Sequence, residues 1–206
     1  MMEAEAPRGP RNTGTRAAPG RGAERNEEDR ELVRRAQGGD EAAFGVLVER
    51  HGDRAYALAL RILKSTSDAE EVAQDALVRA WRSLPRFRGD SAFSSWLYRI
   101  VARQAFDRAA VLKNRRRREA GGEGIEEVQA ETTGLDPEAR ERAVRLERLV
   151  QGLPEVPRTV VTLYYYQDRS VAEVAKILGM PENTVKTHLS RARTALRTGW
   201  TDEETR

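Results

Sequence analysis

The sequence predicts an all-α protein made of two small helical domains joined by a flexible acidic linker. Apolar residues recur at spacings of three and four over most of the 206 residues, and strand-like alternation persists nowhere. A segment rich in glycine and acidic residues, 118–136, interrupts the helical pattern. The length suits one or two domains, so the segment is expected to divide residues 28–117 from residues 137–198.

The composition excludes several functional classes. Without cysteine there is no disulfide, thiolate metal site or cysteine nucleophile, and His51 and His188 are too isolated to hold a metal. No cofactor is expected. No apolar run approaches the roughly 18 to 20 residues of a membrane span, and the N-terminus lacks the apolar segment of a signal peptide. A cytoplasmic location without a membrane span is therefore expected.

The first elements follow a tail, residues 1–27, that is expected to be disordered because proline, glycine and arginine dominate it. A short helix begins at about Glu28 and is stopped by Gly38 and Gly39. Asp40 then caps a longer helix with an apolar stripe. His51 falls on that stripe, which favours a packed histidine over a catalytic one.

The next predicted helix runs from Ser67 to Leu84, with Ser67 and Glu70 spaced as a capping box. Small apolar residues share one face of this helix. The opposite face carries Asp68, Glu71, Gln74 and Asp75. Two interpretations stay open for that polar face, a solvated surface or a docking surface for a basic partner.

Pro85 ends this helix, and the loop RFRGDS leads into a basic helix that starts at about Ser91. From Arg99 to Arg118 this helix has one acid, Asp107, among many arginines. A basic helix beside a loop with aromatic rings is typical of a nucleic-acid surface, whereas a solubilising tail is the alternative.

The second domain carries a helix-turn-helix pattern. Ser170 and Glu173 form a capping box, Gly179 supplies a turn, and Pro181 suits the first position of the second helix. The inward face of the second helix carries the apolar residues Val185, Leu189, Ala192 and Leu196. The residues that point outward or flank the outward face are Lys186, Thr187, Ser190, Arg191, Arg193, Thr194 and Arg197. The outward face suits DNA, and a helical hairpin with a solvated face is the alternative. The preceding tyrosines 164–166 are expected to pack in the core, and residues 199–206 to form a tail.

These motifs together resemble the extracytoplasmic-function sigma factors, minimal members of the sigma-70 family of bacterial transcription initiation factors. The resemblance to the conserved region two of that family is carried by the segment SDAEEVAQDALVRAWRSLPRFRGDSAFSSWLYRI. The resemblance to region four of the family is carried by the segment LPEVPRTVVTLYYYQDRSVAEVAKILGMPENTVKTHLSRARTAL. The resemblance covers roughly residues 28–197.

The resemblance implies a set of sites. Region two, residues 28–117, would bind the clamp helices of the polymerase β′ subunit through Asp68, Glu71, Gln74 and Asp75. It would open the minus-ten promoter element and hold a flipped base through Arg86, Phe87, Arg88, Gly89, Asp90, Ser91, Trp96, Arg99 and Arg103. Region four, residues 137–198, would bind the β flap and read the minus-thirty-five element through Lys186, Thr187, Ser190, Arg191 and Arg193.

The implied partners are core RNA polymerase, promoter DNA and an anti-sigma factor, and no enzymatic activity is expected. The sequence departs from the family at Arg103, where asparagine is common, at Asn183, where glycine is common, and at His188, where arginine is common. The promoter sequences of the family are therefore not carried over. The alternative is a regulator of the LuxR type, because NTVKTHLSR also resembles the output domain of that class.

Overall fold

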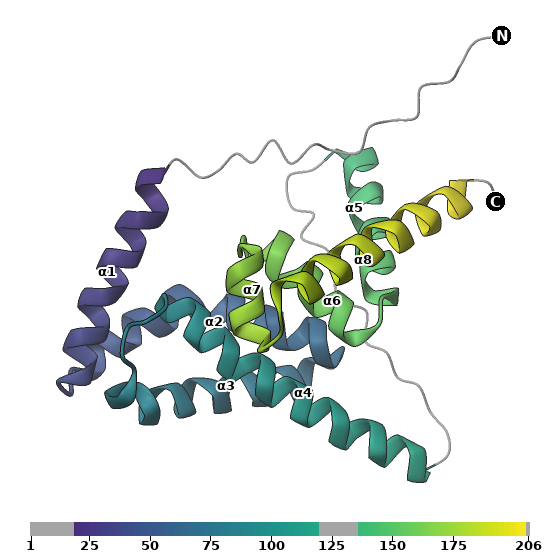
Figure 1. Ribbon diagram of the computed structural model, residues 1–206. Helices are drawn as coiled ribbons and strands as arrows, with labels where there is room; N and C mark the ends of the chain where they lie inside the picture. The colour runs from purple at the N-terminus through teal and green to yellow at the C-terminus, as the bar shows by residue number, and fades with distance from the viewer. Residues whose placement is uncertain (1–18, 120–135, 205–206) are drawn as a thin grey trace.

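The computed structural model describes residues 19–119 and 136–204. Within these ranges the chain is helical and has no strand, which confirms the all-α class. Helices α1 to α4 form one group, and α5 to α8 form a second group that packs against it (Figure 1). No helix in these ranges is both long and apolar enough to cross a membrane.

The first group contains α1 (Pro19–Gln37), α2 (Glu41–Leu63), α3 (Thr66–Ser83), the 3-10 turn η1 (Leu84–Arg86) and α4 (Phe93–Glu119). Helices α2, α3 and α4 pack on one another, and α1 packs mainly on α2. Their apolar stripes meet in a core around Leu47, Leu58, Leu97 and Val101, which are fully buried. The alanine-rich face of α3 is buried as predicted and lets this helix approach its neighbours closely.

The second group contains α5 (Pro137–Gly152), α6 (Glu155–Val161), the π-helical turn η2 (Thr162–Tyr166), α7 (Val171–Leu178) and α8 (Glu182–Glu204). Val150, Val160, Leu163, Val174 and Val185 form its core. Buried apolar residues continue from this core into that of the first group, so the two groups share a packed interface.

Helix caps account for several of the observed boundaries. The carboxylate of Asp40 accepts from the amide of Ala43, as predicted. The capping box predicted at Ser67 and Glu70 is wrong, because α3 begins at Thr66 and its N-cap is Ser65, two residues earlier, which accepts from the amide of Asp68. Helix α2 ends at Leu63, and its C-cap residue Lys64 adopts the left-handed conformation. This turn of the chain places Ser65 directly before the next helix.

Three helices extend beyond their expected limits. Helix α1 starts at Pro19, inside the tail predicted to be disordered, α4 continues to Glu119, and α8 continues to Glu204 through most of the predicted C-terminal tail. The extensions of α1 and α4 contain arginine and glutamate, which are strong helix formers although they add no apolar stripe. The extension of α8, residues 199–204, has no arginine and contacts α5 through Trp200. The predictions for residues 1–18, 120–135 and 205–206 lie outside the described residues.

His51 is packed between helices, as predicted. Its Nε2 lies 2.7 Å from Oδ2 of Asp29, which ties α2 to α1. Burial raises the pKa of Asp29, but the hydrogen bonds and positive charges of His51 and Arg50 outweigh it and hold that pKa below its usual value. The prediction of a tyrosine core in region four is wrong for Tyr165 and Tyr166, which are 44% and 40% exposed.

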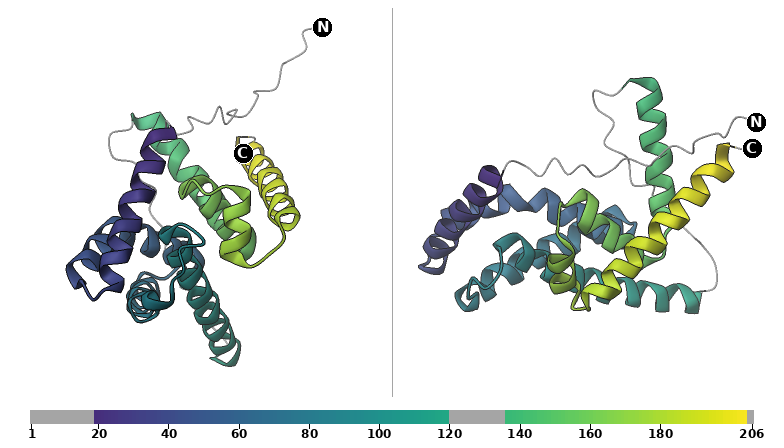
Figure 2. Two further views of the ribbon diagram at one scale, coloured as in Figure 1. Left: turned by 60° about the vertical axis from the view of Figure 1, so that its left-hand side comes forward. Right: turned by 45° about the horizontal axis from the view of Figure 1, so that its top comes forward.

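The far end of α8 is fixed against α5. A Cβ added to Gly199 would lie 2.7 Å from Cδ2 of Leu149, and the guanidinium of Arg145 covers the ring of Trp200 with its carbon 4.2 Å from the ring centre. The two helices project together from the rest of the molecule (Figure 2). Only a residue without a side chain fits at position 199 without a shift of Leu149.

Candidate nucleic-acid interface

The helix-turn-helix forms as its local sequence predicts. Ser170 caps α7 by accepting from the amide of Glu173, whose carboxylate accepts in return from the amide of Ser170. Gly179 ends the helix with φ 64°, a left-handed conformation that glycine adopts without a steric penalty. The carbonyl of Pro181 accepts from the amide of Val185 at 3.2 Å, so Pro181 precedes α8 instead of occupying its first position.

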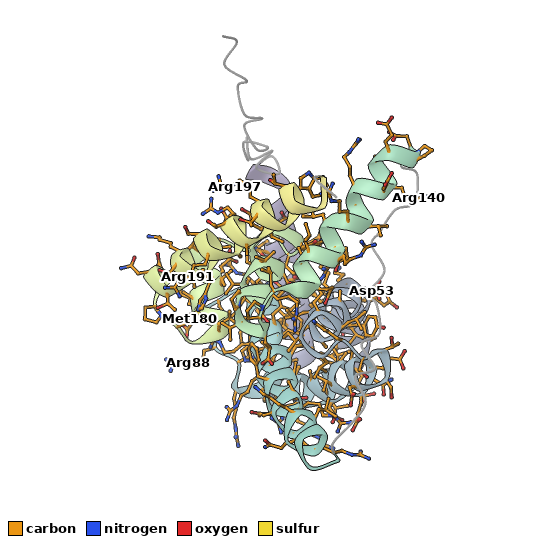
Figure 3. All side chains as sticks on the ribbon, turned by 90° about the vertical axis from the view of Figure 1, so that its right-hand side faces the viewer. Asp53, Arg88, Arg140, Met180, Arg191 and Arg197 are labelled. Atoms are coloured by element: carbon orange, nitrogen blue, oxygen red, sulfur yellow. The ribbon has the colours of Figure 1, made fainter. Side chains whose placement is uncertain are left out.

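The outward face of α8 is open to solvent. Val185, Leu189 and Ala192 are buried against the supporting helices, while Lys186, Thr187, Ser190 and Arg191 are exposed. Figure 3 shows Arg191 and Arg197 projecting from α8. Hydroxyl and guanidinium groups on a protruding helix match the donors and acceptors that the major groove presents. The structure therefore brings together the residues predicted to read duplex DNA.

Arg193 is oriented differently from these residues. Its Nε donates to the carbonyl of Leu189 at 3.2 Å, within the same helix. Thr187 makes a similar bond to the carbonyl of Asn183 at 2.8 Å, but its oxygen can still accept a further hydrogen bond. The Nε of Arg193 is therefore engaged within the helix, although the side chain is exposed like those of the four residues named above.

In the first helix group, the aromatic side chains in and just after the loop between η1 and α4 form a cluster of tilted and edge-to-face rings. The ring of Phe87 lies 4.7 Å from that of Trp96 and 6.4 Å from that of Phe93, measured between centroids. Phe93 is buried, whereas Phe87 and Trp96 are half-buried. Gly89 adopts φ 76° at the tip of the loop, and Arg88 and Asp90 beside it are more than 80% exposed. The rings thus support a loop with an exposed polar tip.

A cleft of about 490 Å³ separates this loop from α1. Val33, Phe87 and Phe93 contribute apolar surface, and Arg30, Arg34 and Arg88 contribute positive charge. The remaining lining residues are Asn26, Glu27, Asp29, Gln37, Gly89, Ser91 and Ala92. The carboxylates of Glu27 and Asp29 also line the cleft, and Arg30 pairs with Glu27. Its volume is in the range of small-molecule sites, and apolar side chains beside arginines suit a nucleobase and its phosphate.

Gln37 holds the cleft in this shape. Its side-chain amide donates to the carbonyl of Leu84 at 2.9 Å and to that of Phe87 at 2.8 Å, and these carbonyls lie at the start of the loop. Both bonds are partly buried and connect α1 with a segment about 50 residues further along the chain. Gln37 therefore fixes the position of the loop relative to α1.

The basic residues of α4 lie outside the cleft. Arg99 and Arg103 are exposed one and two turns beyond Trp96, on the same side of the helix. Arg103 is not among the residues that line the cleft, so its predicted contact with the flipped base stays a prediction. The arginines form instead a stripe that leads away from it along α4.

The acidic face of α3 is partly neutralised within the chain. Arg108 of α4 donates to Oδ1 of Asp68 at 2.7 Å and to Oε2 of Glu71 at 2.8 Å. The hydrogen bond and negative charge of Asp68, with the charge of Glu71, raise the pKa of Arg108 despite the opposing effect of burial. Gln74 and Asp75 are exposed, as is Val78, whose exposed fraction is 48%. The open part of this face is therefore centred on Asp75 and Val78.

Sequence reasoning missed the α1 wall of the cleft. The residues of this wall recur at spacings of three and four, and they are Asn26, Arg30, Val33 and Gln37. One face of a helix was therefore recognisable from the sequence. The contact of that face with the loop was not, because it depends on tertiary packing. Within residues 19–119 and 136–204, no group of three or more histidine, aspartate or glutamate side chains could hold a metal ion.

Comparison with protein families matches both halves of the chain. Residues 47–118 match the model of sigma-70 region 2, and residues 143–196 match the model of sigma-70 region 4. The matches fall on the first and second helix groups in that order. A regulator of the LuxR type would account for a helix-turn-helix in the second group but not for a region 2 match in the first.

Curated relatives match along most of their length. The RNA polymerase sigma-H factor of Pseudomonas aeruginosa is 35% identical over 179 residues, which cover 82% of this chain and 92% of that protein. The ECF RNA polymerase sigma-E factor of Escherichia coli K12 is 36% identical over 177 residues, with the same two coverages. The solved structure of CnrH in complex with the cytosolic domain of CnrY superposes with a TM-score of 0.61 at 27% identity, covering 83% of this chain and 96% of CnrH.

Proposed function

The chain belongs to the extracytoplasmic-function sigma factors of the sigma-70 family, and we propose that its two helix groups divide promoter recognition between duplex and melted DNA. As an RNA polymerase sigma factor it directs core polymerase to promoters. The observation that carries the division of labour is the presence of two different reading surfaces, a protruding helix on region four and a cleft on region two.

Region four, residues 137–198, reads the minus-thirty-five element as duplex DNA. Helix α8 enters the major groove, where Ser190 and Arg191 reach base edges and Lys186 and Thr187 anchor to phosphates. The exposure of all four residues, on a helix with a fully buried opposite face, supports this assignment. Arg193 contributes less, because its guanidinium is already bonded to its own helix.

Region two, residues 28–117, opens the minus-ten element. An extruded base enters the cleft between α1 and the loop of Arg86, Phe87, Arg88, Gly89, Asp90 and Ser91. Melting costs about 1.4 kcal/mol per base-pair step. Stacking of one base on an aromatic ring returns about 1 to 3 kcal/mol. Trp96, Arg99 and Arg103 then guide the separated strand along α4, where the two arginines contact phosphates.

Polymerase docks on α3. The β′ clamp helices contact the exposed part of the acidic face, Gln74, Asp75 and Val78, while Asp68 and Glu71 act mainly through their bonds to Arg108. An exposed valine beside an exposed carboxylate combines apolar area with charge complementarity, which is a common composition for a protein interface. Region four contacts the β flap.

Membership in this family also implies the partners of the protein and the place where it acts. Its partners are core RNA polymerase and promoter DNA, and a regulator of the anti-sigma kind covers it, as CnrY contacts CnrH. The function lies in binding and in DNA melting, so the chain performs no covalent chemistry of its own. It acts in the cytoplasm, where core polymerase is found.

A reconstituted run-off assay tests this function. Core polymerase with this protein is expected to produce defined transcripts from a fragmented genomic library, whereas core polymerase alone is not. If the protein instead binds short duplex sites tightly without polymerase and yields no sigma-dependent start sites, it acts as a conventional regulator and the proposal fails. A variant with Ser190 and Arg191 replaced by alanine serves as the matched control for promoter specificity.

A further inference from the structure

Asp29 places a buried carboxylate in the wall of the cleft between α1 and the loop. It is 5% exposed, whereas the side chain of Glu27, the other carboxylate of the cleft, is 68% exposed and pairs with Arg30. A buried charge costs free energy unless hydrogen bonds or opposite charges compensate it. Asp29 therefore differs from the exposed charges around it, and its surroundings explain how the charge is held there.

Two side chains of α2 hold this carboxylate. Nε2 of His51 lies 2.7 Å from Oδ2, and Nη1 of Arg50 donates to Oδ1 at 3.3 Å. The hydrogen bonds and charges of these two partners keep the pKa of Asp29 below its ordinary value, so the carboxyl group is ionised at neutral pH. An ionised carboxylate only accepts, and its two oxygens offer about four acceptor sites. Asp29 thus has acceptor capacity to spare, more of it on Oδ1, whose bond is the longer.

Aromatic surface lies beside the carboxylate. The ring of His51 is 5.5 Å from that of Phe93, measured between centroids, and Phe93 lines the cleft together with Phe87. Helix α1 packs beside the turn η1 that leads into the loop (Figure 1). A base that enters the cleft therefore meets aromatic side chains and, at Asp29, an acceptor. Stacking tolerates every base, whereas hydrogen bonds to the base edge distinguish one base from another.

The four bases differ in what they offer to a carboxylate. Adenine, cytosine and guanine each carry an exocyclic amine, which donates hydrogen bonds. Thymine has none and presents carbonyl oxygens and a methyl group instead. A carbonyl oxygen placed against a buried carboxylate leaves two acceptors facing each other without a donor, and unpaired buried groups of this kind discriminate strongly between ligands.

We propose that Asp29 is a specificity-determining residue of the cleft, which selects an extruded base with an exocyclic amine and excludes thymine. The inference rests on the proposed function, because it requires that the cleft receives an extruded base. The arginines of the cleft, Arg30, Arg34 and Arg88, offset the repulsion between the carboxylate and the phosphate of the same nucleotide. Stacking and phosphate contacts then hold the nucleotide, and Asp29 reads its base.

A structural role alone for Asp29 has a different consequence. The bonds to His51 and Arg50 join α1 to α2, so the loss of the carboxylate weakens the first helix group whichever base is present. A protein weakened in this way opens every promoter less well but keeps the same order of preference among bases. A contact between Asp29 and the base instead changes that order at a single position of the promoter.

Selection from a promoter library tests the role of Asp29. The minus-ten element is randomised, the complete chain is combined with core polymerase, and the bases enriched in open complexes are counted. The unmodified protein should deplete thymine at one position of the non-template strand. Asp29→Asn keeps the size of the side chain and turns one acceptor into a donor, so this depletion should fall by about 5- to 150-fold, the range for one specific base contact. The order of preference at the other positions should stay the same.

Two further variants serve as matched controls. Glu27→Gln removes the charge of the exposed carboxylate of the cleft and should leave the base preferences unchanged. Arg50→Ala removes one partner of Asp29 but keeps the carboxylate, so it should lower the free energy of unfolding in urea without changing the base preferences. The same unfolding measurement shows whether Asp29→Asn is folded.

Base analogues test the contact from the side of the DNA. At the position where thymine is depleted, the favoured base is replaced by its analogue without the amine. Open complexes of the unmodified protein should then decrease by about 5- to 150-fold, and this part of the test needs no variant. With Asp29→Asn the same replacement should have little further effect, as in a double-mutant cycle of two groups in contact. An equal decrease with both proteins would mean that another group reads the amine.

The outcomes separate this inference from the proposed function. Base preferences that Asp29→Asn leaves unchanged would overturn the role of Asp29 and leave the sigma function intact. The same conclusion holds if the unmodified protein excludes thymine at no position, or if removal of the amine has no effect on it. Failure of the unmodified protein to form open complexes with any member of the library would count against the proposed function itself.

Discussion

Replacing Gln37 by alanine should impair promoter opening while leaving duplex recognition intact. The substitution removes two hydrogen bonds, to the carbonyls of Leu84 and Phe87, which hold the loop against α1. The loop then gains freedom to move away from the cleft that we propose for the extruded base. Region four is unaffected, since Gln37 lies on α1 and both of these bonds end within region two.

The size of the effect follows from the two bonds. Each contributes about 0.5 to 1.5 kcal/mol net, and a carbonyl left buried without a partner costs about 1 to 3 kcal/mol. The bonds are only partly buried, so the freed carbonyls can reach water and the lower range applies. A total of about 1 to 3 kcal/mol corresponds to a reduction of about 5- to 150-fold in the population of the closed loop.

Fluorescence of 2-aminopurine in the minus-ten element measures this reduction as a loss of open complex formed by the holoenzyme. Gln37→Glu keeps the length of the side chain but presents a carboxylate to two carbonyls, so it should be at least as harmful as alanine. Arg35→Ala is the matched control on the same helix, because Arg35 pairs with Asp40 and not with the loop. Equal opening by Gln37→Ala and the unmodified protein would refute the role given to this residue.

Four further substitutions test other parts of the interface. Asp75→Lys should weaken binding to core polymerase about tenfold in a competition assay, as expected for reversal of one exposed interface charge. Arg191→Ala should cost about 1 to 3 kcal/mol in minus-thirty-five binding, measured by gel shift at fixed salt. Arg103→Asn should leave the selected minus-ten base unchanged but weaken single-strand binding, because Arg103 lies outside the cleft; a changed base in a randomised minus-ten selection would return it to the pocket. Burial raises the pKa of Glu173, but its bonds to Ser170, the charge of Arg169 and its bond to Ser95 outweigh burial and hold that pKa below its ordinary value. Its stabilisation is therefore present above the ordinary pKa and is lost as pH falls through the lowered one. Glu173→Gln should therefore reduce the acid dependence of the free energy of unfolding measured in urea.

The features that were predictable from sequence are those encoded by neighbouring residues. The helix-turn-helix depends on a capping box at Ser170 and a left-handed glycine at Gly179, and both signals lie within ten residues of each other. The buried face of α3 follows from helical periodicity alone. Such signals do not require knowledge of what packs against them.

The start of α3 shows where local signals are ambiguous. Ser65 and Ser67 are both competent caps, and the pair Ser67 and Glu70 also fits the capping-box pattern. The choice between them is made by the end of α2, because Lys64 adopts φ 55° and turns the chain at that point. One left-handed residue that is not glycine therefore shifted the boundary by two positions.

The remaining features are contacts between distant segments. The α1 wall of the cleft and the bridge from Arg108 to the acidic face join residues 37 to 50 positions apart, and Arg158 reaches carbonyls 96 and 97 positions away. No periodicity in the sequence indicates which segments meet. The extended end of α8 belongs with these contacts, because Trp200 packs on Arg145 of α5. The extended start of α1 was missed for a different reason, since charged helix formers add helical propensity without an apolar stripe.

The tight seat of Gly199 against Leu149 has a mechanical consequence for the helix that carries Arg191. Helix α8 is gripped near its beginning by Val185 and Leu189 and near its far end by α5, so it is a rod clamped at two points along its axis. These two contacts together oppose rotation of α8 about its axis, and rotation by a single residue step would turn its outward face by about 100°. The direction in which Lys186 to Arg191 point therefore depends in part on a contact 8 to 13 residues further along the helix, at a glycine.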